Sequence, residues 1–304
     1  MRVACIGECM VELTLPRETG GETRVGFAGD TFNAAVYLKR TAPEASVAYV
    51  TAVGTDALSE GMVATFAAEA LDTGLVERRA DRAPGLYAIS VDANGERSFT
   101  YWRESSAART LFLPPAQVTP DRLAGFDLVY LSGITVAILT PEGRRALLDF
   151  LPGYRSAGGK VSFDSNYRPR LWPDAATARR ELAAFWRMTD VALPSIDDEM
   201  ALWGDRDAAG VLARLRGFGV REGALKCGAE GPVPIGPCGA VPAFPKAERV
   251  VDTTAAGDSF NGAYLAAVLR GADEAGRLAA GHAMAAEVIG HPGAIIPRGS
   301  PSSG

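Results

Sequence analysis

The sequence predicts an α/β fold in which a mainly parallel sheet is covered by helices. Short apolar runs, rich in β-branched residues and ending in small or polar residues, alternate along the chain with longer segments of helical periodicity. One segment departs from this rhythm, because residues 85–103 alternate with period two around Asn94-Gly95, a pair that favours a tight hairpin turn. We therefore expect a large helix-covered sheet that carries a small antiparallel appendage.

The individual elements follow from these patterns. Strands are expected at 3–7, 47–54, 128–133, 161–165 and 190–195. Helices are expected at 30–40, 59–73, 141–157, 174–187, 197–202 and 207–218. Because sheets of this kind bind ligands at the carboxyl ends of their strands, polar residues that follow a strand are candidates for a functional site.

The appendage is expected to form a lid. The runs 10–15 and 23–27 can complete an antiparallel sheet with the hairpin, so the lid strands come from about 10–27 and 85–103. A two-residue turn at Asn94-Gly95 would pair residues whose numbers sum to 189, which places Tyr87 and Tyr101 on opposite faces. If both tyrosines face a ligand, the connection must have an odd number of residues or contain a bulge.

Composition and charge argue against several classes of function. The 304 residues are 47% hydrophobic and 22% charged, as in ordinary globular proteins, and the net charge of −5 argues against a nucleic-acid-binding surface. No apolar run approaches the roughly 20 residues of a membrane span, and the N-terminus has no signal-peptide pattern. Four cysteines without Cys-x-x-Cys spacing and two histidines argue against a zinc site. We expect a cytoplasmic protein with reduced thiols and small-molecule ligands.

The segment VVDTTAAGDSFNGAYLAAVL, residues 250–269, combines a helix start with a lone carboxylate. Ala255, Ala256 and Gly257 would let a phosphate approach the unpaired N–H groups of a helix N-terminus. Asp258 would repel a polyphosphate unless it had another task, and accepting a proton from an attacking hydroxyl is such a task. The alternative is an ordinary first-turn acid in a helix that a threonine at 253 or 254 caps.

Four motifs, in order, resemble those of the ribokinase-like (PfkB) carbohydrate kinases. DTTAAGDSFNGAYLA resembles the D-T-x-G-A-G-D signature, and AGDTFNAA (28–35) is similar to the Gly-Gly-x-x-x-Asn sugar element. FDSNYRPRLW (163–172) resembles the Asp-x-Asn-x-Arg element, and LKCGAEG (225–231) the nucleotide loop. The resemblance implies a three-layer α/β/α fold in a single domain over 1–298. The closing residues RGSPSSG are themselves typical of a disordered tail, which is expected at 299–304. A P-loop kinase is excluded, because no G-x-x-x-x-G-K-[ST] motif occurs.

The resemblance also implies roles for the motif residues. Asp258 would be the catalytic base, and the backbone N–H groups of Ala255, Ala256 and Gly257 would form an anion hole. ATP would bring Mg²⁺, held mostly by phosphates and water. The other implied contacts are Gly29, Asp30 and Asn33 with the sugar; Asn166, Ser195, Lys226, Gly228, Gly231 and Gly257 with the nucleotide; and, as a weaker carry-over, Asp252 and Thr254 with a monovalent cation such as K⁺.

Arginines and tyrosines favour an anionic substrate. Tyr101 and Arg103 share a face of the expected lid strand, Tyr87 lies on the other arm of the hairpin, and Arg168 follows the strand that ends at Asp164. Two guanidinium groups beside aromatic hydroxyls suit a carboxylate. With GHPGAIIPR (290–298), these features are most similar to the family branch that phosphorylates 2-keto-3-deoxygluconate at its 6-hydroxyl, giving 2-keto-3-deoxy-6-phosphogluconate.

Several alternatives stay open. The chain could be a fructokinase, a 2-keto-3-deoxygalactonate kinase, another ribokinase-like sugar kinase, or a sugar-binding protein without catalysis. Asp258 disfavours the last, because binding alone needs no base. For Arg103 and Arg168 the alternative is a surface ion pair. Homo-oligomers are expected to form through the lid, because open sheet edges tend to be covered.

The sequence also departs from the family pattern. Ala28 and Ala255 replace family glycines, and Ala255 carries strain if its φ is positive. Ser195 and Asp198, with Glu199 adjacent, stand where the family has Asn-x-x-Glu, so the magnesium ligands are not assigned.

Overall fold

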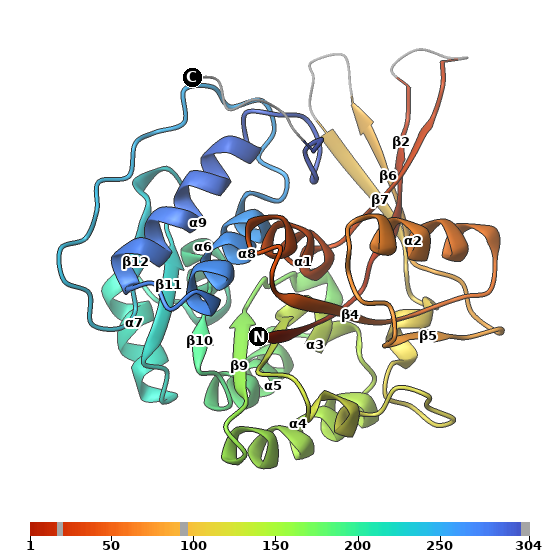
Figure 1. Ribbon diagram of the computed structural model, residues 1–304, viewed down its shortest axis with the longest axis horizontal. Coiled ribbons are helices and arrows are strands. Elements are labelled where there is room, and N and C mark those ends of the chain that lie inside the picture. The colour runs from red at the N-terminus through yellow and green to blue at the C-terminus, as the bar shows by residue number, and fades with distance from the viewer. Residues whose placement is uncertain (17–20, 92–96, 299–304) are drawn as a thin grey trace.

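An eight-stranded, mainly parallel sheet lies at the centre of the protein (Figure 1). The computed structural model describes residues 1–16, 21–91 and 97–298, and in these ranges the strand order is β12-β11-β10-β9-β8-β1-β4-β5. Every neighbouring pair is parallel except β11 and β12, which confirms the predicted sheet type. The strands are β1 (Arg2–Ile6), β4 (Ser46–Val53), β5 (Val76–Arg78), β8 (Leu128–Ser132), β9 (Lys160–Asp164), β10 (Val191–Ala192), β11 (Glu222–Lys226) and β12 (Pro232–Pro234).

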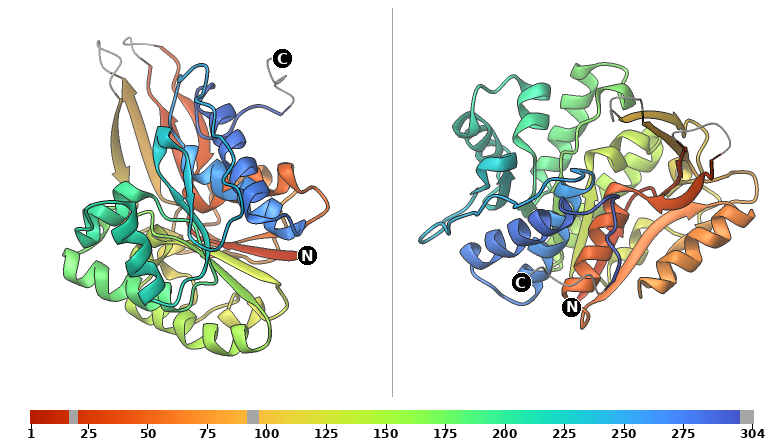
Figure 2. Two further views of the ribbon diagram at one scale, coloured as in Figure 1. Left: turned by 90° about the vertical axis from the view of Figure 1, so that its left-hand side faces the viewer. Right: turned by 90° about the horizontal axis from the view of Figure 1, so that it is seen from above.

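Helices cover both faces of this sheet and complete three layers (Figure 2). Side chains of β1 alternate between two cores, with Val3 and Cys5 in one and Ala4 and Ile6 in the other, so the strand is apolar after its first residue. α1, α2, α8 and α9 pack on the Val3 side, and α3 to α7 on the opposite side. The helices are α1 (Asp30–Thr41), α2 (Ala57–Ala68), α3 (Gly133–Ile138), α4 (Pro141–Ser156), α5 (Ala175–Arg187), α6 (Ile196–Trp203), α7 (Ala208–Gly217), α8 (Ala256–Leu269) and α9 (Glu274–Val288), with short 3₁₀ helices at Ala107–Thr110, Pro120–Leu123, Pro169–Leu171 and Gly228–Glu230.

Most predicted elements are confirmed, and α2 shows how capping shifts a boundary. The periodic pattern predicted a helix over 59–73, but the Asp56 carboxylate caps the helix by accepting hydrogen bonds from the N–H groups of Leu58 (2.9 Å) and Ser59 (3.0 Å). The helix therefore begins at Ala57, and it ends before Ala70, whose φ of 56° is left-handed. The strand predicted at 190–195 is reduced to β10, followed closely by a proline that cannot donate to a ladder.

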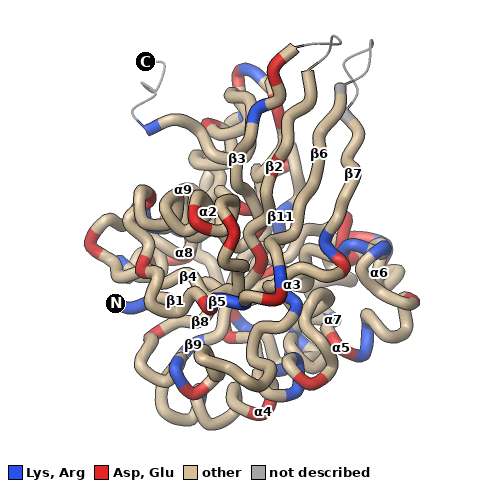
Figure 3. Tube along the Cα trace, turned by 90° about the vertical axis from the view of Figure 1, so that its right-hand side faces the viewer, with Lys and Arg blue, Asp and Glu red and all other residues tan. Residues whose placement is uncertain are grey.

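Four further strands form the lid, β2 (Met10–Thr14), β3 (Arg24–Ala28), β6 (Leu86–Val91) and β7 (Arg97–Trp102). Figure 3 shows them side by side in the order β3-β2-β6-β7 above the body of the molecule. The outer pairs are antiparallel as predicted, whereas β2 and β6 run parallel.

The hairpin register puts Tyr87 directly opposite Tyr101, which confirms the prediction of an odd-numbered connection. Val91 pairs with Arg97, so the connection consists of residues 92–96, and the predicted turn at Asn94-Gly95 lies outside the described residues. The expected tail at 299–304 also lies outside them, and the domain limits 1–298 stay a prediction. Within the described ranges no helix is both long enough and apolar enough to cross a bilayer.

Candidate active site

Two cavities lie next to each other at the carboxyl ends of the central strands. The lid cavity, of about 440 Å³, lies between the lid and the starts of α1 and α8. The loop cavity, of about 480 Å³, lies between the segment after β11, residues 246–253, α8 and α9. The wall that the two cavities share consists of Ser195, Lys226, Thr253, Ala256 and Gly257. Two ligands, one in each cavity, would therefore meet at the first turn of α8.

This first turn offers backbone N–H groups to an anion. Among the described residues, no side-chain hydrogen bond caps the N-terminus of α8. The N–H of Ala256 donates to the carbonyl of Thr253 at 3.2 Å, whereas in the described part of the chain the N–H groups of Ala255 and Gly257 make no hydrogen bond. Donors of this kind at a helix N-terminus attract negative charge. Ala255 and Gly257 thus offer N–H donors at this turn, whereas the Ala256 N–H is used within the turn, and the binding of an anion here stays a prediction.

Ala255 adopts the left-handed conformation, with φ 61° and ψ 15°. An L-residue with a Cβ is strained there, so we expect Ala255→Gly to raise the free energy of unfolding by about 1 kcal/mol. The matched control is Ala256→Gly, because that residue is helical and the change should destabilise the protein by about 0.5–1 kcal/mol. Urea unfolding measures both changes, and a loss of stability in Ala255→Gly would contradict the strain.

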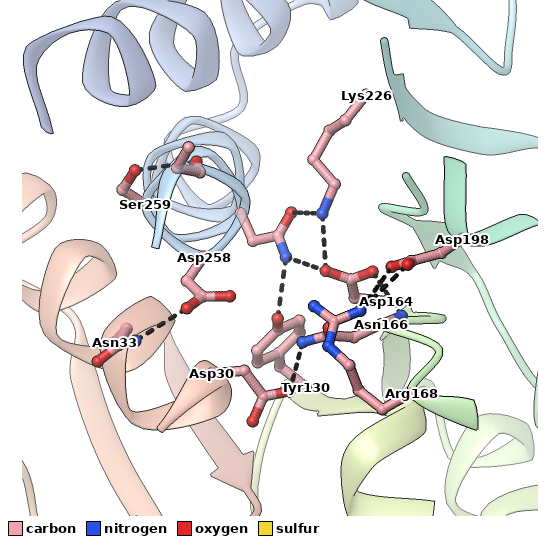
Figure 4. A network of polar contacts seen from close by, with 12 residues as sticks. Asp30, Asn33, Tyr130, Asp164, Asn166, Arg168, Asp198, Lys226, Asp258 and Ser259 are labelled. Atoms are coloured by element: carbon pink, nitrogen blue, oxygen red, sulfur yellow. Dashed lines mark hydrogen bonds and ion pairs between the residues drawn. The ribbon is translucent and has the colours of Figure 1, made fainter. Parts of the chain in front are cut away.

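Asp258 lies in the first turn of α8 and lines the lid cavity. Its Oδ2 accepts a hydrogen bond from the Asn33 Nδ2 of α1 at 2.8 Å (Figure 4). Burial, followed by the negative charge of Asp30, raises the pKa of Asp258 to about 7, and the Asn33 hydrogen bond opposes this shift. A carboxylate with this pKa, in a cavity beside an anion site, is suited to accept a proton at neutral pH.

The predicted sugar element lines the same cavity, and its Asn33 contacts Asp258 directly. Gly29 is required by a close approach, because a Cβ there would lie 2.1 Å from the Glu8 carbonyl oxygen. The Oδ2 of Asp30 accepts a hydrogen bond from the Asn166 Nδ2 at 2.8 Å (Figure 4). Asn166 was predicted to contact the nucleotide, but it lines the lid cavity and does not line the loop cavity. Asn166 has a positive φ of 30°, and its contact with the nucleotide stays a prediction.

Sequence reasoning missed a buried network beneath this wall. Lys226 Nζ donates to Asp164 Oδ2 at 2.7 Å and to Asn261 Oδ1 at 3.0 Å (Figure 4). Asn261 Nδ2 donates to the same Asp164 oxygen at 2.7 Å and to the Tyr130 hydroxyl at 3.0 Å. Asp164 and Asn261 stand inside quoted motifs, but their contact joins residues 97 positions apart and leaves no local signal.

The lid contributes aromatic side chains to the cavity. Tyr87 and Tyr101 both line it, and their ring centroids are 5.6 Å apart. The Tyr87 hydroxyl donates to the Glu12 carboxylate of β2, and burial, together with that carboxylate, raises the pKa of Tyr87. The Arg170 guanidinium, which the sequence did not single out, lies 3.7 Å from the Tyr101 ring centroid. The two tyrosines therefore lie where the sequence predicts them.

Of the two arginines expected to bind an anion, the structure places one in the cavity. Arg168 lines the lid cavity, and its Nη1 pairs with the Asp198 carboxylate at 3.1 Å (Figure 4). Arg103 is 6% exposed, does not line the cavity and forms an ion pair with Glu8. The substrate contact predicted for Arg103 stays a prediction; in the structure this residue follows the last residue of β7, Trp102, and its guanidinium group is paired with Glu8.

The predicted nucleotide loop borders the loop cavity. Gly228 and Gly231 line it, with φ values of 57° and 86°. A Cβ on Gly231 would also lie 2.6 Å from the Phe244 ring, so this turn requires glycine. Ser195 lies at the start of α6 on the wall between the cavities. These residues surround a space separate from the one that Asp258 faces.

The acidic residues Asp198 and Glu199 near the wall form ion pairs with arginines of the protein. Glu199 is buried and paired with Arg214 at 2.7 Å, while Asp198 is paired with Arg168. Among the described residues, no group of three or more His, Cys, Asp or Glu could hold a metal ion. The magnesium ligands therefore stay unassigned.

Asp252 and Thr254 organise the loop that leads to α8. Asp252 Oδ1 accepts hydrogen bonds from the Thr254 N–H (3.0 Å) and hydroxyl (2.7 Å). Its Oδ2 accepts from the Gly293 N–H at 2.7 Å, within the closing GHPGAIIPR segment. The loop before the anion site is thereby tied to the C-terminal segment.

Comparisons with known proteins agree with this geometry. The model of the pfkB family of carbohydrate kinases matches residues 1–301. The chain is 45% identical to 2-dehydro-3-deoxygluconokinase of Escherichia coli (strain K12), covering 98% of this chain and 97% of the relative. It is 46% identical to 2-dehydro-3-deoxygluconokinase of Dickeya dadantii (strain 3937), covering 97% and 96%. The crystal structure of an E. coli protein in complex with ATP and Mg²⁺ has the same fold, with a TM-score of 0.81 at 22% identity over 96% of this chain and 94% of that one. The chain belongs to the pfkB family of carbohydrate kinases.

Proposed function

We propose that this protein transfers the γ-phosphoryl group of ATP to the 6-hydroxyl of 2-keto-3-deoxygluconate, also called 2-dehydro-3-deoxygluconate, giving 2-keto-3-deoxy-6-phosphogluconate. One observation carries the proposal: the first turn of α8 is a wall common to two cavities, and Asp258 faces only one of them. The sugar acid occupies the lid cavity and ATP the loop cavity. Phosphoryl transfer asks a protein mainly for this kind of positioning.

In the proposed mechanism each residue has a separate task. Asn33 holds the Asp258 carboxylate in place through a hydrogen bond. This carboxylate accepts the proton of the sugar 6-hydroxyl while the hydroxyl oxygen attacks the γ-phosphorus. The free N–H groups of Ala255 and Gly257 stabilise the negative charge on the transferring group. Gly228 and Gly231 have no side chain, so the backbone of this loop can approach the bound nucleotide closely. Magnesium, when bound with ATP, supplies charge neutralisation at the phosphates.

The rate should depend on pH through Asp258. Its pKa of about 7 means that the carboxylate is protonated, and unable to act as a base, below that pH. We therefore expect kcat/KM to fall tenfold per pH unit well below pH 7 and to level off above it. Between the ordinary carboxyl pKa and about pH 7, Asp258 is protonated in the folded protein and ionised in the unfolded chain. The free energy of unfolding therefore falls as the pH rises through that window. A flat rate from pH 5 to 8 would contradict the base assignment.

The sugar acid is assigned from the cavity and from the relatives. Arg168 supplies a guanidinium group on the lid cavity, and Tyr87 and Tyr101 offer hydroxyls nearby. Relatives that match nearly the whole chain carry the name 2-dehydro-3-deoxygluconokinase. A coupled assay of ADP release across 2-keto-3-deoxygluconate, its C4 epimer, fructose and ribose tests the assignment. Turnover of fructose or ribose at a higher kcat/KM than either keto acid would refute it.

The finer cofactor proposal concerns a monovalent cation. We propose that K⁺ binds beside Asp252 and Thr254, because a buried carboxylate there organises the loop that leads into the anion hole. Exchanging K⁺ for tetramethylammonium, which is too large for such a site, should lower kcat. An equal kcat in both salts would contradict this part of the proposal.

The remaining proposals concern assembly and location. We propose a homo-oligomer through the lid, whose Val25 and Trp102 are each 56% exposed and whose Phe99 is 40% exposed. Sedimentation should give a mass above the 31.9 kDa of one chain, and a species of that mass alone would refute it. We propose a cytoplasmic location because the reaction consumes ATP and all four cysteines are free thiols. Fractionation that recovers the protein outside the cytoplasm would contradict it.

A further inference from the structure

We propose that Lys226 is a catalytic residue whose ammonium group contacts the phosphoryl group during transfer, because it lies at the junction of the two cavities and is held there by two fixed acceptors. The inference rests on the proposed function, with ATP in the loop cavity and the sugar acid in the lid cavity. Resemblance to the family implies only that this residue borders the nucleotide.

The ammonium group lies against the anion hole. Lys226 is the last residue of β11, is 9% exposed and lines both cavities. A Cβ built on Gly257 would lie 3.5 Å from its Nζ. An ammonium group has three N–H donors, and within the described part of the chain Nζ uses two of them, on Asp164 and Asn261. The third donor is therefore left for a ligand at the wall.

Asn261 acts as a positioning residue for this cation. Its amide oxygen accepts from Lys226, while its Nδ2 donates to Asp164 and to the Tyr130 hydroxyl. The network joins the ends of β9 and β11 and the middle of β8 to α8, so the position of Nζ is set by four elements of the fold. A cation fixed in this way needs little reorganisation when charge develops beside it.

The chemistry assigns opposite tasks to Lys226 and Asp258. During transfer the bond between the γ-phosphorus and the oxygen of departing ADP breaks, the bond to the 6-oxygen forms, and the hydroxyl proton passes to Asp258. Lys226 keeps its proton and offsets the negative charge that develops on the phosphoryl and departing oxygens. An interaction that strengthens in the transition state affects kcat, whereas one that is equal in bound ATP affects only KM.

The test begins with Lys226→Met in the full-length protein. We expect kcat to fall about 100-fold while the KM for ATP changes by less than about threefold. The acidic limb of the pH–rate profile should also move to higher pH. The charge of Lys226 lowers the pKa of Asp258, whereas burial, Asp30 and Asp164 raise it, so removing the cation leaves the base protonated to a higher pH. The shift of this limb reports how close the charge lies to Asp258, whereas the fall in kcat at a nearly unchanged KM for ATP reports its role in the chemical step.

A second variant controls for the possibility that Lys226→Met misfolds. Lys226→Met alone leaves the buried Asp164 carboxylate without its ion pair, whereas Lys226→Met combined with Asp164→Asn leaves no unpaired charge. We expect the double variant to keep a cooperative thermal transition and still to lose about 100-fold in kcat. Lys160→Met, at an exposed lysine on the same sheet, is the matched control with unchanged kinetics.

Two outcomes would overturn the inference. If the double variant keeps kcat within about threefold of wild type and only the KM for ATP rises, Lys226 binds the nucleotide and does not act in the chemical step. Because the comparison uses whichever sugar the wild-type protein phosphorylates, the inference survives a failed substrate assignment. A wild-type protein that phosphorylates no sugar refutes both.

Discussion

Replacing Asp258 by asparagine is expected to reduce kcat by about 10²- to 10⁴-fold, because the variant loses the base that accepts the hydroxyl proton. Binding should persist, since the amide oxygen of the new side chain can still accept the hydrogen bond from Asn33. A coupled assay gives kcat, and calorimetric titration with ADP and the sugar acid gives the two dissociation constants. Loss of turnover with binding intact separates a catalytic group from a binding group.

Stability supplies an independent measurement on the same variant. The raised pKa of Asp258 means that its charge destabilises the folded state at alkaline pH, so Asp258→Asn should have the higher Tm at pH 8 and a smaller advantage at pH 5. Asp121→Asn, at an exposed acid remote from both cavities, should change neither turnover nor this pH dependence. Wild-type turnover in Asp258→Asn would remove the basis of the mechanism.

Replacing Arg168 by leucine is expected to raise the KM for the sugar acid by about 10- to 100-fold, the cost of a lost charge-assisted hydrogen bond. The KM for ATP should stay unchanged, because Arg168 lines the lid cavity and does not line the loop cavity. Steady-state kinetics with each substrate varied in turn measures both constants.

The controls for Arg168 separate charge from geometry. Arg168→Lys keeps the charge but loses the planar pair of donors, so it should recover only part of the affinity. Arg187→Leu removes an exposed arginine of α5 and should leave both KM values unchanged. An unchanged KM for the sugar acid in Arg168→Leu would mean that Arg168 serves only its ion pair with Asp198.

Local patterns predicted what depends on local geometry. The alternation in the hairpin, with the requirement that Tyr87 and Tyr101 share a face, predicted the odd connection that the register shows. The small residues before Asp258 predicted an exposed helix start, and the alanine at 255 does take the left-handed conformation that the family glycine suggests. These features involve residues close in sequence, where periodicity and turn chemistry decide the outcome.

Features that depend on distant partners were not predictable in the same way. Arg103 is paired with Glu8, a residue 95 positions away, and this contact leaves no local pattern in the sequence. The pairing of Lys226 with Asp164 and Asn261 exists only once three elements have packed. α9 was missed because its many alanines and glycines, EAGRLAAGHAMAAEV, leave little contrast between its faces.

The account's central claim is that phosphoryl transfer takes place at the first turn of α8, between the two cavities. A crystal structure with ADP, magnesium, aluminium fluoride and 2-keto-3-deoxygluconate tests it most directly, because the fluoride group marks the position of the transferring phosphoryl group. We expect that group within hydrogen-bond distance of the Gly257 N–H and Lys226 Nζ, with the sugar 6-hydroxyl on the Asp258 side. A fluoride group away from this turn, or a sugar acid in the loop cavity, would contradict the account.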